Sequence, residues 1–254
     1  MSCWQSLLTV ATHFSLAACG AGSVVACSAG TTAALRQWGY VHRIGRAYGA
    51  YRSGVTGTYR EGKRMTLRVR AMTPQDITPV AQLHTSSWRA TYRGLLRDSY
   101  LDGPVHAERL AAWTERLSAP NSTDIALVAE DKTGPLGFLF ALPEHDRSLG
   151  TLLDNIHVRP DRYGQGIGTC LLTHLCDRLI NLESQTGVYL WATEGNLRSR
   201  KYYQRLGASA VERAVHDVPG GEAIAEWLYR WETIEQLHEN VLTRHRLAQP
   251  DERD

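Results

Sequence analysis

Three glycines in one short loop are the first residues whose spacing could do chemistry. Gly164, Gly166 and Gly168 stand between a strand-like apolar run and the start of a helical pattern. Glycine has no side chain, so a ligand can approach the backbone closely. Successive N–H groups at a helix N-terminus bind anions, and the helix dipole strengthens that binding. The loop therefore predicts a site for a phosphate-bearing ligand, to which Arg159 and Arg162 could add positive charge.

The spacing of this loop narrows the choice of phosphate ligand. The order Gly-x-Gly-x-Gly lacks the third-glycine offset of a dinucleotide fingerprint, and it lacks the Lys-Ser/Thr pair of a Walker loop. A glycine-rich turn can also be a tight strand-to-helix connection that binds nothing. Both interpretations stay open on the loop alone.

A second motif lies downstream of the loop, and the two motifs together resemble those of one protein family. The stretch Val158–Thr169 resembles the pyrophosphate-binding motif of the GNAT family of N-acetyltransferases, whose pattern [Gln/Arg]-x-x-Gly-x-[Gly/Ala] falls on Tyr163–Gly168. The stretch Asn196–Ala208 resembles the family helix Asn-x-x-Ala-x-x-Phe-Tyr-x-x-x-Gly-Phe. Tyr163 departs from the first pattern, because the usual basic or amide residue is displaced to Arg162. The resemblance covers about residues 66–232.

The resemblance implies an enzyme that transfers the acetyl group of acetyl-coenzyme A (acetyl-CoA) to a primary amine, by direct attack in a ternary complex and without a metal. It implies that Asn196 caps a helix and contacts the cofactor, and that the N–H of Val158 polarises the acetyl carbonyl. The cofactor-binding residues that it implies are Ile156, His157, Val158, Tyr163, Gly164, Gln165, Gly166, Ile167, Gly168, Thr169, Asn196 and Tyr203.

The resemblance also implies catalytic roles. Tyr203 matches the tyrosine that protonates the leaving thiolate, and a phenol with a pKa of about 10 stays protonated at neutral pH; the alternative is a tyrosine that only packs on the sheet. For the general base we expect Asp154, four residues before Val158 and hence on the same strand face. Glu194, at the end of the next strand, is a rival. His157 is expected on the face opposite Asp154.

The acceptor amine is the least determined part of the prediction. Trp88 and Tyr92 stand four apart in an aromatic and basic stretch and could wall an acceptor pocket. A small-molecule amine is the leading acceptor. A protein N-terminus or lysine is an alternative, and so is a non-catalytic module that senses acetyl-CoA.

Periodicity predicts the elements that must position these residues. Alternating residues predict a strand at Leu67–Met72, and helical stripes follow from Thr73 to Trp88 and from Leu110 to Leu117. The later segments are a hairpin over 125–129 and 136–141, a strand at 152–158, a helix at 167–179, a strand at 188–192, a helix at 196–206, and two strands at 209–215 and 224–231. This order predicts an α+β fold, an α/β sandwich. The resemblance implies a mixed, mostly antiparallel sheet of about seven strands flanked by about four helices.

The charge of the first 64 residues differs from that of the rest of the chain. Residues 1–64 hold seven Lys/Arg and one acid, which gives +6, whereas the remaining 21 Lys/Arg and 25 acids give −4. A slightly acidic folded part argues against a nucleic-acid surface. We expect residues 1–64 to be a disordered extension or to precede a true start at Met65; a transit peptide and a lipoprotein signal around Cys19 are alternatives. Residues 65–232 form the expected catalytic domain, and residues 233–254 a charged tail in which we expect a surface helix that frays.

Cysteine usage and hydropathy indicate the cellular compartment of the protein and whether it crosses a membrane. The five cysteines, Cys3, Cys19, Cys27, Cys170 and Cys176, form neither a C-x-x-C pair nor a metal-spaced set with histidine. This count predicts reduced thiols and a cytoplasmic protein without a bound metal. The sequence holds no run of eighteen apolar residues, so we expect no membrane-spanning helix. Family members often form homodimers, but the sequence specifies no interface.

Overall fold

The computed structural model describes residues 67–184, 186–218 and 222–247, all of which belong to one compact unit of the chain. The predicted extension at residues 1–64 and the turn at Pro219–Gly221 lie outside the described residues. So does the end of the predicted tail, residues 248–254.

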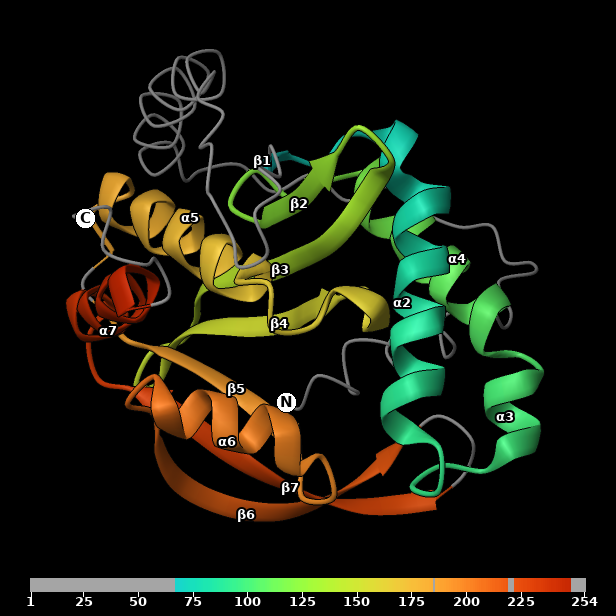
Figure 1. Ribbon diagram of the computed structural model, residues 1–254. Helices are drawn as coiled ribbons and strands as arrows, with labels where there is room; N and C mark the ends of the chain where they lie inside the picture. The colour runs from blue at the N-terminus through green and yellow to red at the C-terminus, as the bar shows by residue number, and fades with distance from the viewer. Residues whose placement is uncertain (1–66, 185, 219–221, 248–254) are drawn as a thin grey trace, which may run out of the picture. The chain divides into compact units, whose positions relative to one another are not determined.

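A seven-stranded mixed sheet forms the centre of this unit, in the order β1-β2-β3-β4-β5-β7-β6 (Figure 1). Its neighbouring strands are antiparallel except for β4 and β5, which are parallel. The strands are β1 (Arg68–Ala71), β2 (Ile125–Asp131), β3 (Gly134–Asp146), β4 (Gly150–Val158), β5 (Val188–Thr193), β6 (Ser209–Val218) and β7 (Glu222–Trp231). The predicted α+β fold class, with a mixed and mostly antiparallel sheet, is confirmed.

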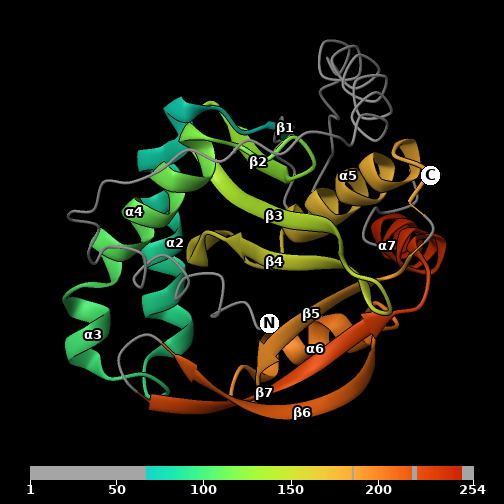
Figure 2. The ribbon, with the colours of Figure 1, turned by 180° about the vertical axis from the view of Figure 1, so that it is seen from behind.

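Helices cover both faces of the sheet (Figures 1 and 2). The described residues form six α-helices: α2 (Ile77–Tyr92), α3 (Asp98–Asp102), α4 (Val105–Ser118), α5 (Ile167–Asn181), α6 (Leu197–Arg205) and α7 (Ile234–Leu247). Helices α2 and α4 pack over one face, called here the α2 face, and α5, α6 and α7 over the other, the α5 face. Helix α3 was not predicted from the sequence, and α7 was expected only as a fraying surface helix of the tail.

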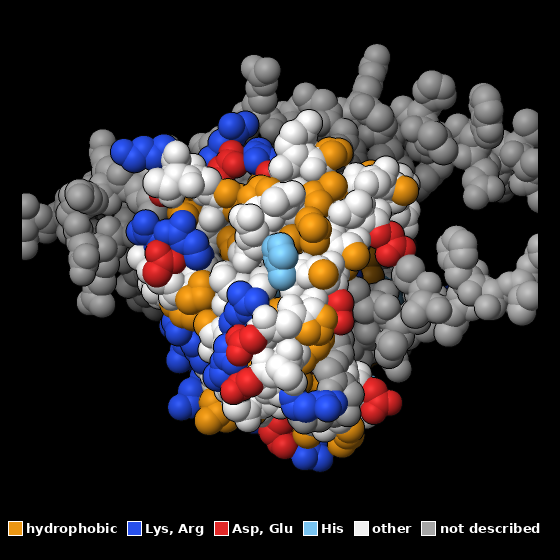
Figure 3. Space-filling view, turned by 90° about the vertical axis from the view of Figure 1, so that its right-hand side faces the viewer, with side chains coloured by type: hydrophobic (Ala, Val, Ile, Leu, Met, Phe, Trp, Pro, Cys, Tyr) orange, Lys and Arg blue, Asp and Glu red, His pale blue; other side chains and the backbone are white. Residues whose placement is uncertain are grey.

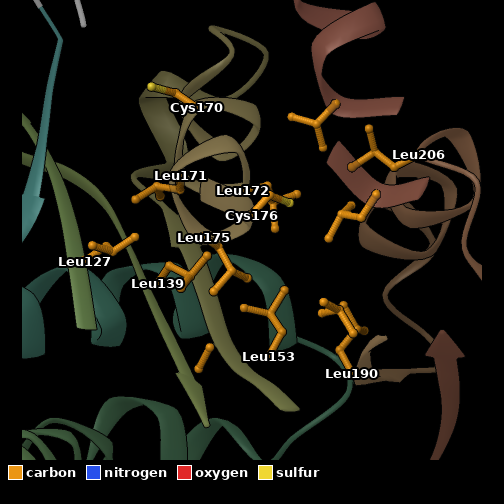
Figure 4. Close-up of a cluster of buried hydrophobic side chains, with 14 of the residues drawn as sticks. Leu127, Leu139, Leu153, Cys170, Leu171, Leu172, Leu175, Cys176, Leu190 and Leu206 are labelled. Carbon is orange, nitrogen blue, oxygen red and sulfur yellow. The ribbon is translucent and has the colours of Figure 1, made fainter. Parts of the chain in front are cut away.

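The core under α5 shows why the helical spacing predicts this packing. Leu171, Leu172 and Leu175 are fully buried against strand residues that include Leu139 and Leu153 (Figure 4). Full burial of a leucine contributes roughly 1.5–3 kcal/mol relative to exposure. This packing fixes the start of α5, and with it the glycine loop, against the sheet.

Helix α7 occupies the segment that the sequence suggested was a charged tail. Ile234, Leu237 and Val241 are buried in the α5-face core, at spacings of three and four that place them on one helix side. Charged residues between them mask this stripe in the sequence. Residues 234–241 are thus part of the folded core.

Within the described part of the chain, the helices are either too short or too polar to cross a membrane. Acidic, basic and hydrophobic side chains are interspersed on the described part of the surface in Figure 3, the side on which Figure 1 shows α2, α3 and α4.

Candidate active site

Strands β4 and β5 separate soon after they meet, and this separation opens the sheet. They pair only at Thr151–Val188 and Leu152–Tyr189. Beyond these pairs the two strands diverge (Figures 1 and 2). A cleft of about 990 Å³ lies there, and it is lined by the ends of β4 and β5, the glycine loop, and parts of α2, α5 and α6.

The edge of β4 offers backbone groups to this cleft. Arg159 donates its N–H to the carbonyl of Leu136 at 2.8 Å, toward β3. Successive backbone groups of a strand point to opposite edges, so the N–H groups of Val158 and Ile156 point away from β3. Both residues line the cleft. A ligand that lies along this edge can therefore pair with β4 as a further strand would.

The glycine loop has the backbone geometry that the predicted anion site requires. Gly164 and Gly166 have φ of +79° and +78°, a left-handed conformation that favours glycine. The first bond of α5 runs from the N–H of Cys170 to the carbonyl of Gly166, at 2.9 Å. The N–H groups of residues 167–169 therefore precede the helical ladder, at the positive end of the helix dipole.

An arginine from another helix lies beside the residue that departs from the family pattern. The guanidinium of Arg198 in α6 lies over the ring of Tyr163, 3.8 Å from its centroid. Arg162 also lines the cleft and forms a 3.6 Å ion pair with Asp161. Arg205 and Arg244 add positive charge to the cleft wall. Sequence reasoning did not identify Arg198, because only the fold brings α6 to the loop.

The second motif places its key residues on the same wall. Asn196 caps α6, because its Oδ1 accepts the N–H of Ser199 at 3.2 Å. Tyr203 lines the cleft and is 7% exposed; its ring packs on Tyr229 and Trp231, with centroids 6.0 and 6.2 Å apart. All the cofactor-binding residues predicted from the sequence line this cleft.

Asp154 does not lie on the face that its spacing suggested. Residues 153 and 155 of β4 pair with consecutive residues of β3, which leaves Asp154 as the extra residue of a β-bulge. A bulge breaks the period-two alternation of side chains. The Asp154 side chain accepts from Arg116 of α4 at 2.6 Å, on the α2 face, whereas Val158 packs with the α5-face core. The expectation that Asp154 shares a face with Val158 is therefore wrong.

The same bulge corrects the expectation for His157. Its ring lies 4.5 Å from the ring of His84 in α2, and its Nδ1 is 3.0 Å from the hydroxyl of Ser87. His157 thus shares the α2 face with Asp154 and is not opposite to it. Burial, with a smaller effect of the Arg109 charge, lowers the pKa of His157 to about 3, so the ring is neutral.

A second, smaller pocket adjoins the cleft on the α2 face. It has a volume of about 30 Å³, room for one group the size of water or ammonium. Tyr92, Asn155, His157 and Trp191 line both this inner pocket and the cleft. The other residues that line the inner pocket are His84, Trp88, Arg109, Ala112, Trp113, Arg116 and Glu226. Both predicted acceptor-binding residues, Trp88 and Tyr92, are thus at this pocket; Trp88 is 4% exposed and also packs in a core cluster.

Two carboxylates stand near the end of β5, because Glu194 directly follows this strand and Glu226 of β7 pairs with its last residue, Thr193. Glu194 is bound at 2.9 Å by Arg213 and at 3.0 Å by the indole N–H of Trp227, which together lower its pKa to about 2. Glu226 is 2% exposed, and its Oε2 lies 2.9 Å from Nδ1 of His216. Sequence reasoning missed Glu226 and His216, which lie beyond both motifs.

Comparison with known proteins decides the family. Residues 81–208, half of the chain, match the model of the acetyltransferase (GNAT) family. The chain belongs to the GNAT acetyltransferase family. Its acetyltransferase relatives include the probable N-acetyltransferase Rv2775 of Mycobacterium tuberculosis, 28% identical over 147 residues, which are 56% of this chain and 80% of that protein. An uncharacterized N-acetyltransferase of Bacillus subtilis, YuaI, is 29% identical over 60% of this chain and 86% of its own.

Solved structures show the same acetyltransferase fold. The PaiA N-acetyltransferase of Thermoplasma acidophilum, in complex with coenzyme A, is 17% identical with a TM-score of 0.50, over 64% of this chain and 98% of that one. A GCN5-related N-acetyltransferase from Rhodopseudomonas palustris is 19% identical with a TM-score of 0.52, over 72% and 99%. Among the described residues of this acetyltransferase, no group of three or more His, Cys, Asp or Glu side chains is placed to hold a metal ion.

Proposed function

We propose that this acetyltransferase moves the acetyl group of acetyl-CoA to a primary amine of a small molecule, by direct attack in a ternary complex. The observation that carries the proposal is the divergence of β4 from β5 directly beside the glycine loop. This arrangement offers a strand edge for an amide-containing arm and an anion cradle at the end of that edge. The complex of PaiA with coenzyme A supports the same ligand for this fold.

The chemistry of the cleft fits acetyl-CoA. The glycines at 164 and 166 keep side chains out of the cradle, and a pyrophosphate suits the N–H groups at the start of α5. Arg162, Arg198 and Arg244 supply positive charge on the cleft wall for a polyanionic ligand. The volume of about 990 Å³ is large enough for a cofactor of this size.

Each residue then has a defined task. Acetyl-CoA supplies the acetyl thioester. The N–H of Val158, directed into the cleft, polarises the acetyl carbonyl as an oxyanion-type donor. Tyr203 donates a proton to the departing sulfur. Asn196 caps the start of α6, the helix that carries Tyr203, and so helps to hold Tyr203 in position.

A small acceptor is favoured by the inner pocket. Its volume of about 30 Å³ admits an amine head group and not a folded surface, and Trp88 and Tyr92 wall it from the α2 side. A peptide N-terminus or a lysine side chain also carries a narrow amine, so these acceptors belong in the test.

The test is release of free thiol from acetyl-CoA with a panel of spermidine, ethanolamine, kanamycin, methionine amide and a peptide with a free N-terminus. We expect turnover with at least one small amine and slower turnover with the peptide. Faster turnover of the peptide would favour the protein acceptor. Binding of acetyl-CoA without turnover of any amine would favour a sensor, and failure to bind it would refute the proposal.

Tyr203→Phe tests the acid, with Tyr202→Phe as its matched control. Tyr202 is adjacent and lines the same cleft, and its hydroxyl is 3.3 Å from that of Thr169. We expect Tyr203→Phe to lower kcat by about 10²-fold or more, with coenzyme A binding retained. The Tyr202→Phe variant should retain most of kcat. Equal activity of the two variants would contradict the assignment.

A further inference from the structure

Resting on the proposed function, we propose that Glu226 accepts the proton that the acceptor ammonium must lose, and that His216 passes this proton to solvent. The amine of the acceptor then enters the inner pocket. Neither residue belongs to the two motifs of the sequence.

The β6–β7 hairpin holds the two residues as a rigid pair. Ala214 is the cross-strand partner of Glu226, and Ile224 is the partner of His216, so the two are diagonal neighbours on one sheet face. Nδ1 of His216 lies 2.9 Å from the carboxylate of Glu226. The His216 ring also packs edge-on against Trp191, with centroids 4.7 Å apart.

The pair connects the inner pocket with the outside. Glu226 lines the pocket and is 2% exposed, so it borders the pocket and has almost no contact with bulk water. The side chain of His216 is 17% exposed. A proton taken up inside by Glu226 can therefore leave through the imidazole without crossing the core.

The proposed base and the proposed acid lie on opposite faces of the sheet. Glu226 shares the α2 face with Leu228, which clusters with Leu152 and Tyr189. Tyr203 packs on Tyr229, on the α5 face. The gap between β4 and β5 connects these two faces. The amine can thus approach from the Glu226 side while the sulfur departs on the Tyr203 side.

The other ionisable groups near the pocket are less suited to be the base. His157 is neutral, but with a pKa near 3 it is a weak proton acceptor, and burial also holds the pKa of His84 well below its usual value. Asp154 is held by Arg116 at 2.6 Å and by the amide of Asn155 at 2.6 Å.

Charge supports the same choice. Arg109 and Arg116 line the pocket as cations, and Glu226 is the one acid among the described residues that line it. The ion pair with Asp154 offsets the charge of Arg116, so an ammonium group in the pocket is attracted to Glu226 and kept away from Arg109.

The protons balance over the reaction. The nitrogen–carbon bond forms, the carbon–sulfur bond breaks, and the sulfur keeps the electron pair. An ammonium acceptor loses two protons in becoming an amide. One leaves through Glu226 and His216, and solvent takes up the other. Tyr203 protonates the sulfur and regains its proton from solvent, so the net release is one proton.

The test compares wild type, Glu226→Gln and Glu226→Asp with the amine of the panel that wild type acetylates fastest. Near neutral pH we expect Glu226→Gln to lower kcat by about 10²- to 10⁴-fold, with coenzyme A affinity unchanged. Glu226→Asp keeps the carboxylate and should lose less. At about pH 10 a much larger share of the amine is already unprotonated than at neutral pH, so the loss in both variants should shrink.

Two further variants complete the design. His216→Gln tests a residue that acts through Glu226, and it should lower kcat less than Glu226→Gln and flatten the pH profile in the same range. Glu194→Gln tests the rival carboxylate after β5: it should leave kcat near that of wild type, and a loss there in place of the Glu226→Gln loss would overturn the assignment. A Glu226→Gln defect that is absent, equals that of Glu226→Asp, or stays constant with pH would overturn the proposal. If the wild-type protein acetylates no amine, the proposed function on which this inference rests is refuted instead.

Discussion

Replacement of Gly164 by alanine separates the anion cradle from ordinary backbone strain. Gly164 has φ +79° and Gly94, which follows α2, has φ +81°; among the described residues, a Cβ at either position meets no atom within 4 Å. Their left-handed conformations therefore cost an alanine about the same, roughly 1 kcal/mol. Gly164 lines the cleft, whereas Gly94 is not among its lining residues. Gly94→Ala is thus a matched control.

The expected magnitudes follow from this geometry. Each variant should melt about 2–4 °C below wild type, for a described unit of this size. Only Gly164→Ala places a methyl group in the cleft, where the proposed phosphate would approach the backbone. The loss of one hydrogen bond to a charged group costs about 1.5–3 kcal/mol, which weakens coenzyme A binding by about tenfold or more.

The assay is calorimetric titration of coenzyme A into the three proteins, together with their melting temperatures. Gly94→Ala should bind as wild type does, despite its lower melting temperature. If Gly164→Ala also binds coenzyme A within about twofold of wild type, the loop is a connection and not a cradle, and the reasoning is refuted.

Three other predictions concern the core and the ionisable groups around the site. Trp113 is 1% exposed and packs between α2 and the sheet. In urea titrations, Trp113→Ala should lower the free energy of unfolding by about 3–5 kcal/mol. The control Ile180→Ala, at an exposed position, should lower it by about 0.5 kcal/mol or less. Unfolded His157 takes up a proton below about pH 6.5, whereas burial and Arg109 prevent uptake by the folded protein until about pH 3. Stability should therefore fall as pH drops through this window, and His157→Gln should make that fall shallower; equal slopes in the two proteins would contradict this. Burial raises the pKa of Cys170 to about 11 and that of Cys176 to about 12. Iodoacetamide should therefore label both thiols only after denaturation. If peptide mapping finds either thiol labelled in the native protein, the packing of α5 described above is wrong.

The sequence predicts most of the fold because its elements have strong periods. The stripe of α5 predicts a helix, and the two short apolar runs of β2 and β3, which turn residues separate, predict a hairpin. Helix α3 has five residues, too few to show a period. The buried stripe of α7 is masked by the charged residues around it.

The site was predicted where it lies within a motif and missed where it depends on tertiary contacts. The glycine loop and Tyr203 reach one cleft because two local motifs pack on the same parallel pair. A bulge has no sequence signature, so the period-two rule misplaced Asp154 relative to Val158 and His157. Arg198 and Glu226 have no local pattern at all, since α6 and the last hairpin bring them to the site. The roles of Tyr203, Asp154 and the acceptor-binding residues stay predictions.

The short pairing of β4 with β5 also bears on how this protein avoids aggregation. A strand edge with unpaired N–H and C=O groups is a template for the strands of other molecules, and most proteins protect such edges with charges or bulges. Here the unpaired edge lies inside the sheet, within a cleft flanked by the start of α5 and by Tyr202 and Tyr203 of α6. A molecule that enters a cleft of about 990 Å³ must be slender, which excludes a folded sheet. The protein can therefore keep an open strand edge for a ligand without exposing it to its neighbours.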